Sequence, residues 1–90
     1  MTADYKKMER LNKAVANRRR LAILAYLKKK GEVPVWDIAQ AIKLSMKATS
    51  QHLGVLRACD VVFWEQRRLE VFYRLAPAPH PIIEAVFKSL

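Results

Sequence analysis

The segment 44–57, LSMKATSQHLGVLR, decides the fold that we predict for this chain. Ser45 can cap a helix over 46–58, because its hydroxyl accepts a hydrogen bond from the free N–H groups of the first turn. One face of that helix has spacings of four and three, at Thr49, Leu53 and Leu56. The other side carries small or polar residues: Lys47, Ser50, Gln51, Gly54 and Ala58. Such a helix can pack by one face and read DNA base edges with the other, or its polar side can simply be solvated.

The composition is that of one small folded domain with a basic surface. The chain has 90 residues, 52% of them hydrophobic, which suffices for a single core. Its formal net charge is +9, from 17 Lys and Arg against 8 Asp and Glu. This charge favours an anionic partner, most commonly nucleic acid; a membrane surface is the alternative, but no apolar run could span a bilayer. We therefore expect one domain over 1–90 that binds double-stranded DNA and no membrane.

The N-terminal segment and the cysteine content predict a cytoplasmic protein, associated with the nucleoid when it is bound to DNA. Residues 1–13, MTADYKKMERLNK, have charges where a signal peptide needs its apolar core. The single cysteine, Cys59, has no partner for an internal disulfide, which agrees with a reducing compartment. We expect Cys59 to be a small, half-buried residue near a helix end rather than a redox sensor.

Two helices are predicted before this segment, over 3–16 and 18–30, from apolar residues that recur every three or four positions. Asn17 lies between them and can cap the second helix. Residues 28–30 are lysines in its last turn, where cations complement the helix dipole. Gly31 can end the helix, so the lysines have a sufficient local explanation.

A helix-turn-helix is predicted next. Val33 can form a very short strand, and Pro34 suits the start of a third helix over 35–42. A tight connection then leads to the helix over 46–58, which presents small polar residues outward. Helix, short turn and helix in this arrangement are the helix-turn-helix pattern, although many other helical pairs share it.

Two strand-like runs follow, Val61–Trp64 and Leu69–Leu75, rich in β-branched and aromatic residues. EQRR at 65–68 places Arg67 and Arg68 at the predicted turn. Arginine at such a wing tip can enter the minor groove or pair with phosphates, whereas the simpler alternative is a solvated hairpin tip. The predicted fold class is mainly α with a small β-hairpin (α+β), a winged helix-turn-helix in the order α-α-(short β)-α-α-β-β-α.

Both ends of the chain carry dense apolar stripes. Pro81 can occupy the first turn of a last helix over 81–89, which is too short to be stable without docking. This helix and the one over 3–16 can cover the core or form a subunit interface, and a two-fold dimer suits DNA geometry. The residues expected at the interface are Tyr5, Met8, Leu11, Val15, Ile82, Ile83, Val86, Phe87 and Leu90.

The ordered set of segments resembles the ArsR-type winged-helix repressors. The similar segments are VANRRRLAIL (15–24), GEVPVWDIAQAIKLS (31–45), SMKATSQHLGVLRACDVV (45–62) and VFYRL (71–75). The terminal helices fit this family in position more than in sequence. The resemblance implies a homodimeric DNA-binding transcriptional regulator, usually a repressor released by a ligand, that pairs through its first and last helices.

The resemblance also implies DNA contacts by position. The residues that fall at the major groove are Lys47, Ser50, Gln51 and His52. Gln51 can pair with adenine and Lys47 with guanine or phosphate, while His52 is also explained as a half-buried face residue. Arg67 and Arg68 fall at the wing, over 61–75, on the minor groove or phosphates. We further expect phosphate contacts at the start of the second helix, from Arg18 and Arg20.

The chain departs from the family where many members bind metal. EVPVWD at 32–37 stands where those members have a Glu-Leu-Cys-Val-Cys-Asp-type motif, so Pro34 and Trp36 replace the two thiolates. His80 and Glu84 have a spacing that suits metal ligands, but two ligands make a weak site at best. We therefore expect no metal and no cofactor.

Glycine usage departs from the family as well. Asp60 replaces the glycine usual after the recognition helix, and Arg68 replaces the glycine usual in the wing turn, so the wing shape is left open. Gly54 stands where lysine is common. It permits close approach of the backbone to DNA, or it is simply tolerated at a small cost in helix stability.

Catalysis finds no support in the sequence. No cysteine–histidine or serine–histidine–acid set can be placed together, and no glycine-rich phosphate loop occurs. We predict a homodimeric, metal-independent, sequence-specific repressor that is not an enzyme. The alternative is a winged helix used for protein interaction or RNA binding, because the reading face has few large polar groups and fold does not fix function.

Overall fold

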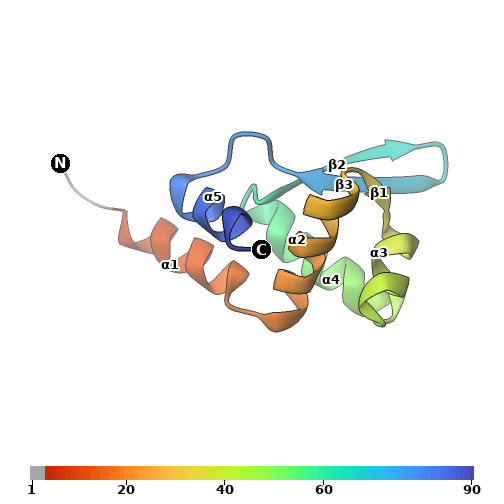
Figure 1. The fold of residues 1–90 in the computed structure, drawn as a ribbon, viewed down its shortest axis with the longest axis horizontal. Coiled ribbons are helices and arrows are strands. Elements are labelled where there is room, and N and C mark those ends of the chain that lie inside the picture. Colours follow the sequence, from red (N-terminus) through yellow and green to blue (C-terminus); the bar gives the residue numbers. More distant parts are fainter. Residues whose placement is uncertain (1–3) are drawn as a thin grey trace.

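The computed structural model describes residues 4–90, as five helices and three short strands (Figure 1). The elements are α1 (Tyr5–Val15), α2 (Arg18–Lys30), β1 (Val33–Pro34), α3 (Val35–Ile42), α4 (Met46–Ala58), β2 (Val62–Arg67), β3 (Glu70–Leu75) and α5 (Pro81–Lys88). This order confirms the predicted winged helix-turn-helix. Residue 3, the predicted start of the first helix, lies outside the described residues.

The helices α2, α3 and α4 have the predicted limits, whereas α1 ends at Val15 and α5 at Lys88, one residue earlier than predicted. Ser45 Oγ accepts a hydrogen bond from the backbone N–H of Ala48 at 3.1 Å, and Asn17 Oδ1 accepts from that of Arg20 at 3.1 Å. Gly31 ends α2 with φ +85°, a conformation that favours glycine because it has no Cβ. Local chemistry therefore sets the starts of α2 and α4 as well as the end of α2.

The strands form one antiparallel sheet in the order β1-β3-β2. β2 and β3 pair along their whole lengths, so only Arg68 and Leu69 remain in the turn. The predicted turn at 65–68 is therefore wrong, because Glu65–Arg67 continue β2. Arg67 is the last residue of the strand, and Arg68 alone of the two arginines lies in the turn.

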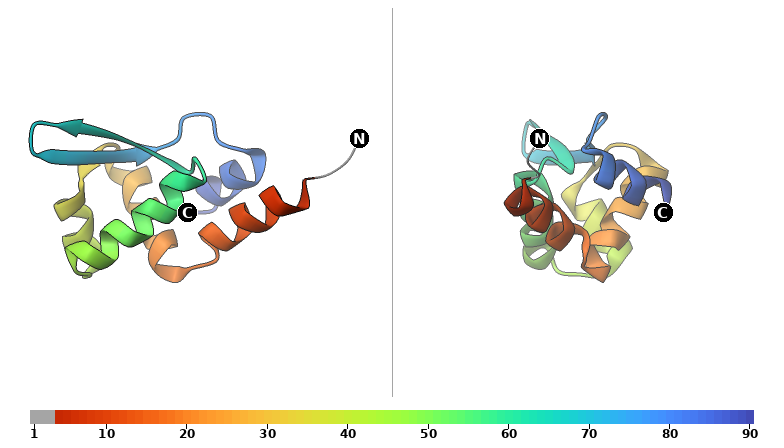
Figure 2. Two further views of the ribbon diagram at one scale, coloured as in Figure 1. Left: turned by 180° about the vertical axis from the view of Figure 1, so that it is seen from behind. Right: turned by 90° about the vertical axis from the view of Figure 1, so that its left-hand side faces the viewer.

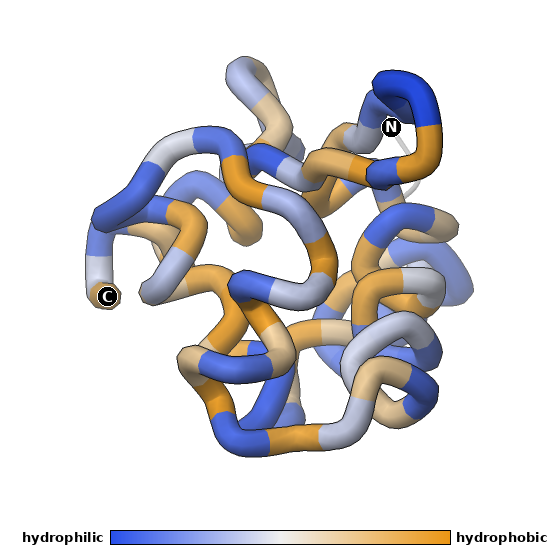
Figure 3. The backbone as a smooth tube through the Cα atoms, turned by 90° about the vertical axis from the view of Figure 1, so that its right-hand side faces the viewer, coloured by the Kyte–Doolittle hydropathy of each residue, from blue (hydrophilic) through white to orange (hydrophobic). Residues whose placement is uncertain are grey.

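The core lies between the helices and the inner face of the sheet. Its fully buried side chains are Ile23, Leu24, Leu27, Ile38, Thr49, Leu53, Leu56, Val61, Val62 and Ile83. The list includes the whole predicted inner face of α4. Figure 3 shows hydrophilic and hydrophobic residues alternating at short intervals along the helices, as expected for elements with one buried side. Within residues 4–90, no helix has the length and apolar character needed to cross a bilayer.

The molecule is elongated, with extents of 45 × 25 × 22 Å, and the β2–β3 hairpin and α1 lie at opposite ends (Figures 1 and 2). Leu11, Val15 and Ile83 are only 3%, 8% and 1% exposed, so they pack in the core of their own chain, and their place in a dimer interface stays a prediction. Tyr5 and Leu90 are 78% and 39% exposed. The other predicted interface residues are half-buried: Met8, Ile82, Val86 and Phe87.

One lysine of α2 fixes the last helix in place. Lys28 Nζ donates to the backbone carbonyls of Phe87 and Leu90 at 2.8 Å each, at the C-terminal end of α5. The Phe87 carbonyl also accepts from the N–H of Leu90 at 3.2 Å, and a cation at the C-terminal end of a helix complements the helix dipole. The docking that so short a helix needs comes from these hydrogen bonds and from the burial of Ile83 in the core.

Candidate nucleic-acid interface

The outward face of α4 presents polar groups that the protein itself does not use. Lys47, Ser50 and Gln51 are all exposed. In the part of the chain that the structure describes, Ser45 and His52 make the side-chain hydrogen bonds of α4 and its cap. Ammonium, hydroxyl and amide groups without internal partners can donate to and accept from base edges in the major groove.

Gly54 is half-buried on α4, and the protein leaves space beside it. A Cβ built on Gly54 would meet no atom within 4 Å outside its own neighbourhood. Packing inside the chain therefore does not require glycine here. Both explanations, close approach of DNA and simple tolerance, stay predictions.

Arg20 and His52, both predicted to contact DNA, contact each other. Arg20 Nε donates to His52 Nδ1 at 3.2 Å, and Arg20 Nη1 donates to the backbone carbonyls of Lys13 and Ala14 at 3.3 Å each. Those carbonyls belong to the last turn of α1, which lacks donors from its own helix. Arg20 thus connects α1, α2 and α4, and its contact with phosphate stays a prediction.

The environment of His52 favours the neutral form of its ring. Burial lowers the pKa of His52 from its ordinary value of 6.5, and the nearby positive charges of Arg20 and Arg19 lower it further. A neutral ring can accept the Arg20 hydrogen bond at Nδ1, whereas a protonated ring cannot. Reading of DNA by His52 stays a prediction, and its half-buried position agrees with the simpler interpretation.

The two wing arginines lie in different environments. Arg67 Nη2 lies 2.6 Å from Glu32 Oε1, and Arg67 Nε lies 2.9 Å from Glu65 Oε2. The Arg67 guanidinium also lies over the ring of Phe72, 4.7 Å from its centroid. Hydrogen bonds to Glu65 and then to Glu32 raise the pKa of Arg67. Arg68 is exposed in the turn, so its charge remains available to a phosphate.

Two other arginines contact aromatic rings in a way that could not be predicted from the sequence. Arg74 lies over Phe63 at 5.4 Å, and Arg57 of α4 lies over Trp64 of β2 at 4.6 Å. These pairs join residues of different elements, so no spacing along the sequence indicates them. The Arg57–Trp64 pair connects the C-terminal end of α4 to the wing.

Among the residues that the structure describes, three other than glycine have a left-handed backbone. Asp60 and Arg68 each have φ +56°, and Lys43, between α3 and α4, has φ +58°. Asp60 and Arg68 are the positions where the resembling family usually has glycine. The chain therefore keeps the glycine-type backbone at both positions, although side chains there cost free energy.

The segment that replaces the family's thiolates does not fit a metal. Pro34 is part of β1 and offers no side-chain donor atom. Trp36 Nε1 donates to Glu70 Oε1 at 2.9 Å and thereby ties α3 to the wing. An indole N–H is a donor only, so it cannot ligate a cation.

The remaining candidate ligands also have other roles. His80 Nδ1 accepts from the backbone N–H of Ile82 at 3.1 Å and caps α5, while Glu84 lies 3.4 Å from Lys88 Nζ. Cys59 is half-buried at the end of α4, as predicted. Residues 4–90 contain no group of three or more His, Cys, Asp and Glu side chains placed to hold a metal.

The sequence and fold match known regulators. A protein-family model described as bacterial regulatory protein, arsR family, matches residues 17–62. The transcriptional activator HlyU of Vibrio cholerae is 41% identical over 66 residues, which cover 73% of this chain and 60% of HlyU. A solved structure of HlyU has a TM-score of 0.82 at 34% identity, covering 99% of this chain and 92% of that chain. The chain spans about 60% of the length of the curated relatives that it matches.

Two further solved structures have the same fold. The first is a Mycobacterium bovis fragment described as a homodimeric winged helix-turn-helix DNA-binding domain of a possible ArsR-family regulator. It has a TM-score of 0.78 at 29% identity and covers 99% of this chain and 83% of that one. The second is the transcriptional repressor PagR of Bacillus anthracis, with a TM-score of 0.75 at 30% identity, covering 93% and 92%.

Proposed function

The chain belongs to the arsR family of bacterial regulatory proteins, and we propose that it binds double-stranded DNA sequence-specifically as a homodimeric transcriptional regulator. The observation that carries this proposal is the outward face of α4, where Lys47, Ser50 and Gln51 are exposed and unused. α4 enters the major groove, where Gln51 suits adenine and Lys47 suits guanine or phosphate. Membership of a family of regulatory proteins also supports the expectation that the chain is not an enzyme.

The wing and the start of α2 supply contacts with the DNA backbone. Arg68 in the turn and Arg18 at the first position of α2 are exposed cations, so they suit phosphates. Arg67 is already paired, so its contribution is to hold the strand end in place. The net charge of +9 adds attraction that is independent of sequence.

The dimer forms through the exposed parts of α1 and α5. Tyr5 and Leu90 are exposed there, and the M. bovis relative is described as homodimeric. Two-fold symmetry places two α4 helices in successive major grooves. Such a dimer acts at the nucleoid of the bacterial cytoplasm.

Repression without metal is the mode of action that we propose. PagR, described as a repressor, supports repression, whereas HlyU is described as an activator. Pro34 and Trp36, in place of thiolates, support metal independence. A reporter gene placed behind the DNA upstream of the gene for this chain distinguishes repression from activation. Deletion of the regulator raises reporter expression if the protein is a repressor and lowers it if the protein is an activator.

Titration of the protein with duplex DNA from the region upstream of its gene tests the proposal. We expect two protomers per site, preference over a scrambled duplex, and a log–log salt slope of about −0.9 per phosphate neutralised. Addition of Zn²⁺ or a chelator should leave the affinity unchanged. Equal affinity for the scrambled duplex contradicts sequence-specific reading, and tighter binding to RNA of the same sequence supports the RNA-binding alternative instead.

A further inference from the structure

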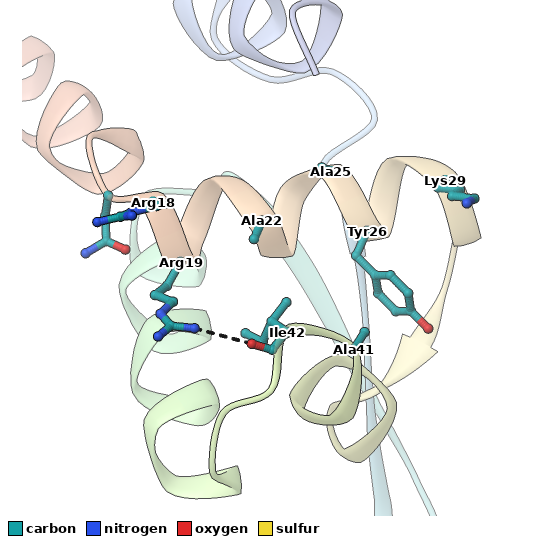
Figure 4. Close-up of a pocket in the computed structure, with 9 residues that line it drawn as sticks. Arg18, Arg19, Ala22, Ala25, Tyr26, Lys29, Ala41 and Ile42 are labelled. Carbon is teal, nitrogen blue, oxygen red and sulfur yellow. Dashed lines mark hydrogen bonds between the residues drawn. The ribbon is translucent and has the colours of Figure 1, made fainter.

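A groove between α2 and α3 lies away from the DNA-reading face. Figure 4 shows it from the open side, with α2 along one edge and the end of α3 along the other. α2 is nearer the viewer in Figure 1, whereas α4 is nearer when the molecule is seen from behind (Figure 2). The groove has a volume of about 910 Å³, within the range of protein binding sites.

Cations border the groove at both ends. Arg18 and Arg19 lie at the start of α2 and Lys29 at its end, and all three are exposed. These ends are about 16 Å apart along the helix, or three turns. Within the described chain, no carboxylate lines the groove. Asp37 lies near it, and its Oδ1 accepts a hydrogen bond from the Tyr26 hydroxyl at 2.6 Å.

Between the cations the groove is lined by small apolar side chains and by the half-buried ring of Tyr26. Ala22 of α2 lies on the side of the helix toward Ala41 and Ile42 of α3, whereas Ala25, which also lines the groove, lies on the other edge of α2 (Figure 4). Arg19 spans the two sides, because its Nη1 donates to the carbonyl of Ile42 at 3.4 Å. Alanine leaves room for another backbone to come close, so apolar side chains of a partner can fill the space between α2 and α3.

We propose that this groove docks an acidic amphipathic helix of a partner protein. The apolar ridge of such a helix contacts the apolar lining, and carboxylates on its flanks meet the arginines at one end and Lys29 at the other. A groove of three turns matches the length of a short helix. This inference goes beyond the proposed DNA binding and does not depend on it.

Other occupants fit the groove less well. A second copy of this chain is disfavoured because it brings no acidic helix: each helix that the structure describes contains at most one Asp or Glu. Duplex DNA presents one charge per 1.7 Å or so along its axis, whereas this groove offers widely separated cations around an apolar lining. A small organic anion would stay largely hydrated, because the cations themselves are exposed.

A synthetic peptide provides the probe. We choose an amphipathic helix of about four turns with leucine along one face and glutamate on both flanks. Titrated into the isotope-labelled chain, it should shift the backbone amide NMR signals of Ala22, Ala25 and Ala41 and leave those of Lys47 and Gln51 unchanged. The same peptide with glutamine in place of glutamate should bind at least fivefold more weakly.

Matched variants locate the contact. Lys29→Glu should weaken peptide binding roughly fivefold, whereas Lys30→Glu, an equally exposed change in the same turn but outside the groove, should have much less effect. Ala22→Trp fills the groove from an exposed position and should abolish binding. Arg18 is not varied, because it is also a proposed phosphate contact. Duplex binding of the Lys29 variant reports on the DNA function separately.

Three results would overturn the inference. The first is equal affinity for the glutamate and glutamine peptides, and the second is equal effects of the Lys29 and Lys30 variants. The third is displacement of the peptide from wild type by a scrambled duplex, with the duplex shifting the same alanine signals, which would make nucleic acid the occupant. Loss of sequence-specific DNA reading alone leaves the inference intact.

Discussion

On α4, Lys47 and Gln51 are exposed and have no partner in the described chain, whereas at the wing Arg67 already pairs with Glu32 and Glu65. A group with unused hydrogen-bonding capacity can discriminate between bases, since a wrong base leaves it unsatisfied. A group that is already paired changes little in free energy when DNA arrives. The comparison therefore predicts that the helix supplies specificity and that Arg68, the unpaired wing arginine, supplies sequence-independent affinity.

The largest expected effect is that of Gln51→Ala. Loss of a bidentate contact should weaken binding to the preferred duplex by about 1–3 kcal/mol, or roughly 5- to 150-fold, and leave the scrambled duplex almost unaffected. Fluorescence anisotropy titrations measure both affinities. Gln40→Ala, the same chemical change at an exposed position of α3, serves as control. An equal loss on both duplexes would show that Gln51 contacts the backbone only.

The next largest effect distinguishes the two wing arginines. Arg68→Ala should weaken all sequences alike and make the salt slope less steep by about 0.9, corresponding to one phosphate. Arg67→Ala should leave the slope nearly unchanged, because its partners are Glu32 and Glu65. Equal changes in slope for the two variants would mean that Arg67 leaves its carboxylates to meet DNA, and the contrast between helix and wing would fail.

The buried hydroxyl of Thr49, on the inner face of α4, has a predicted cost in the free energy of unfolding. This hydroxyl is fully buried, and within residues 4–90 it has no hydrogen-bond partner. Thr49→Val removes that hydroxyl and keeps the shape, so the free energy of unfolding should rise by about 1 kcal/mol. Urea denaturation measures this change, and Thr49→Ser, which keeps the hydroxyl and loses the methyl group, should be destabilised. A less stable Val variant would reveal a partner for the hydroxyl, such as a buried water.

Gly54→Ala separates the two explanations of this glycine. The open space around Gly54 predicts that alanine stabilises the fold by roughly 0.5–1 kcal/mol through helix propensity. Unchanged DNA affinity then means that glycine is merely tolerated. A clear loss of affinity with increased stability means that DNA approaches the α4 backbone at this position.

The smallest effect concerns pH. Because folding lowers the pKa of His52, the unfolded chain binds more protons, and stability therefore rises with pH. The contribution of His52 is complete above its ordinary pKa of 6.5 and decreases as pH falls through the lowered value of the folded state. His52→Gln keeps an acceptor for Arg20 and removes the titration. Unfolding free energies measured from neutral to mildly acidic pH should fall less steeply for this variant than for wild type, whereas parallel curves would contradict the assignment.

Features that depend on neighbouring residues could be predicted from the sequence. Ser45 and Asn17 cap the helices that they were predicted to cap, and two runs rich in β-branched and aromatic residues indicated the hairpin. The turn was misplaced because no glycine marks it and Arg68 adopts φ +56° despite its side chain. Local chemistry thus determined the elements better than their exact limits.

Features that depend on packing could not be predicted. Arg67 pairs with Glu32 across 35 positions, and Arg20 meets His52 across 32 positions, so no spacing rule connects either pair. The resemblance implied DNA contacts for Arg67 and His52 by position alone, and Arg20 was expected to contact phosphate from the start of the second helix. Packing then engages Arg67 and Arg20 within the protein and leaves Arg68 exposed.

The position of Arg20 has a consequence for the geometry of the operator. Its planar guanidinium fixes the angle between α1 and α4 by donating to both, whereas lysine offers a single point of attachment without that planar fork. In a dimer joined through α1, this angle sets the separation of the two α4 helices. The number of base pairs between half-sites then depends on a contact inside each subunit, far from any base.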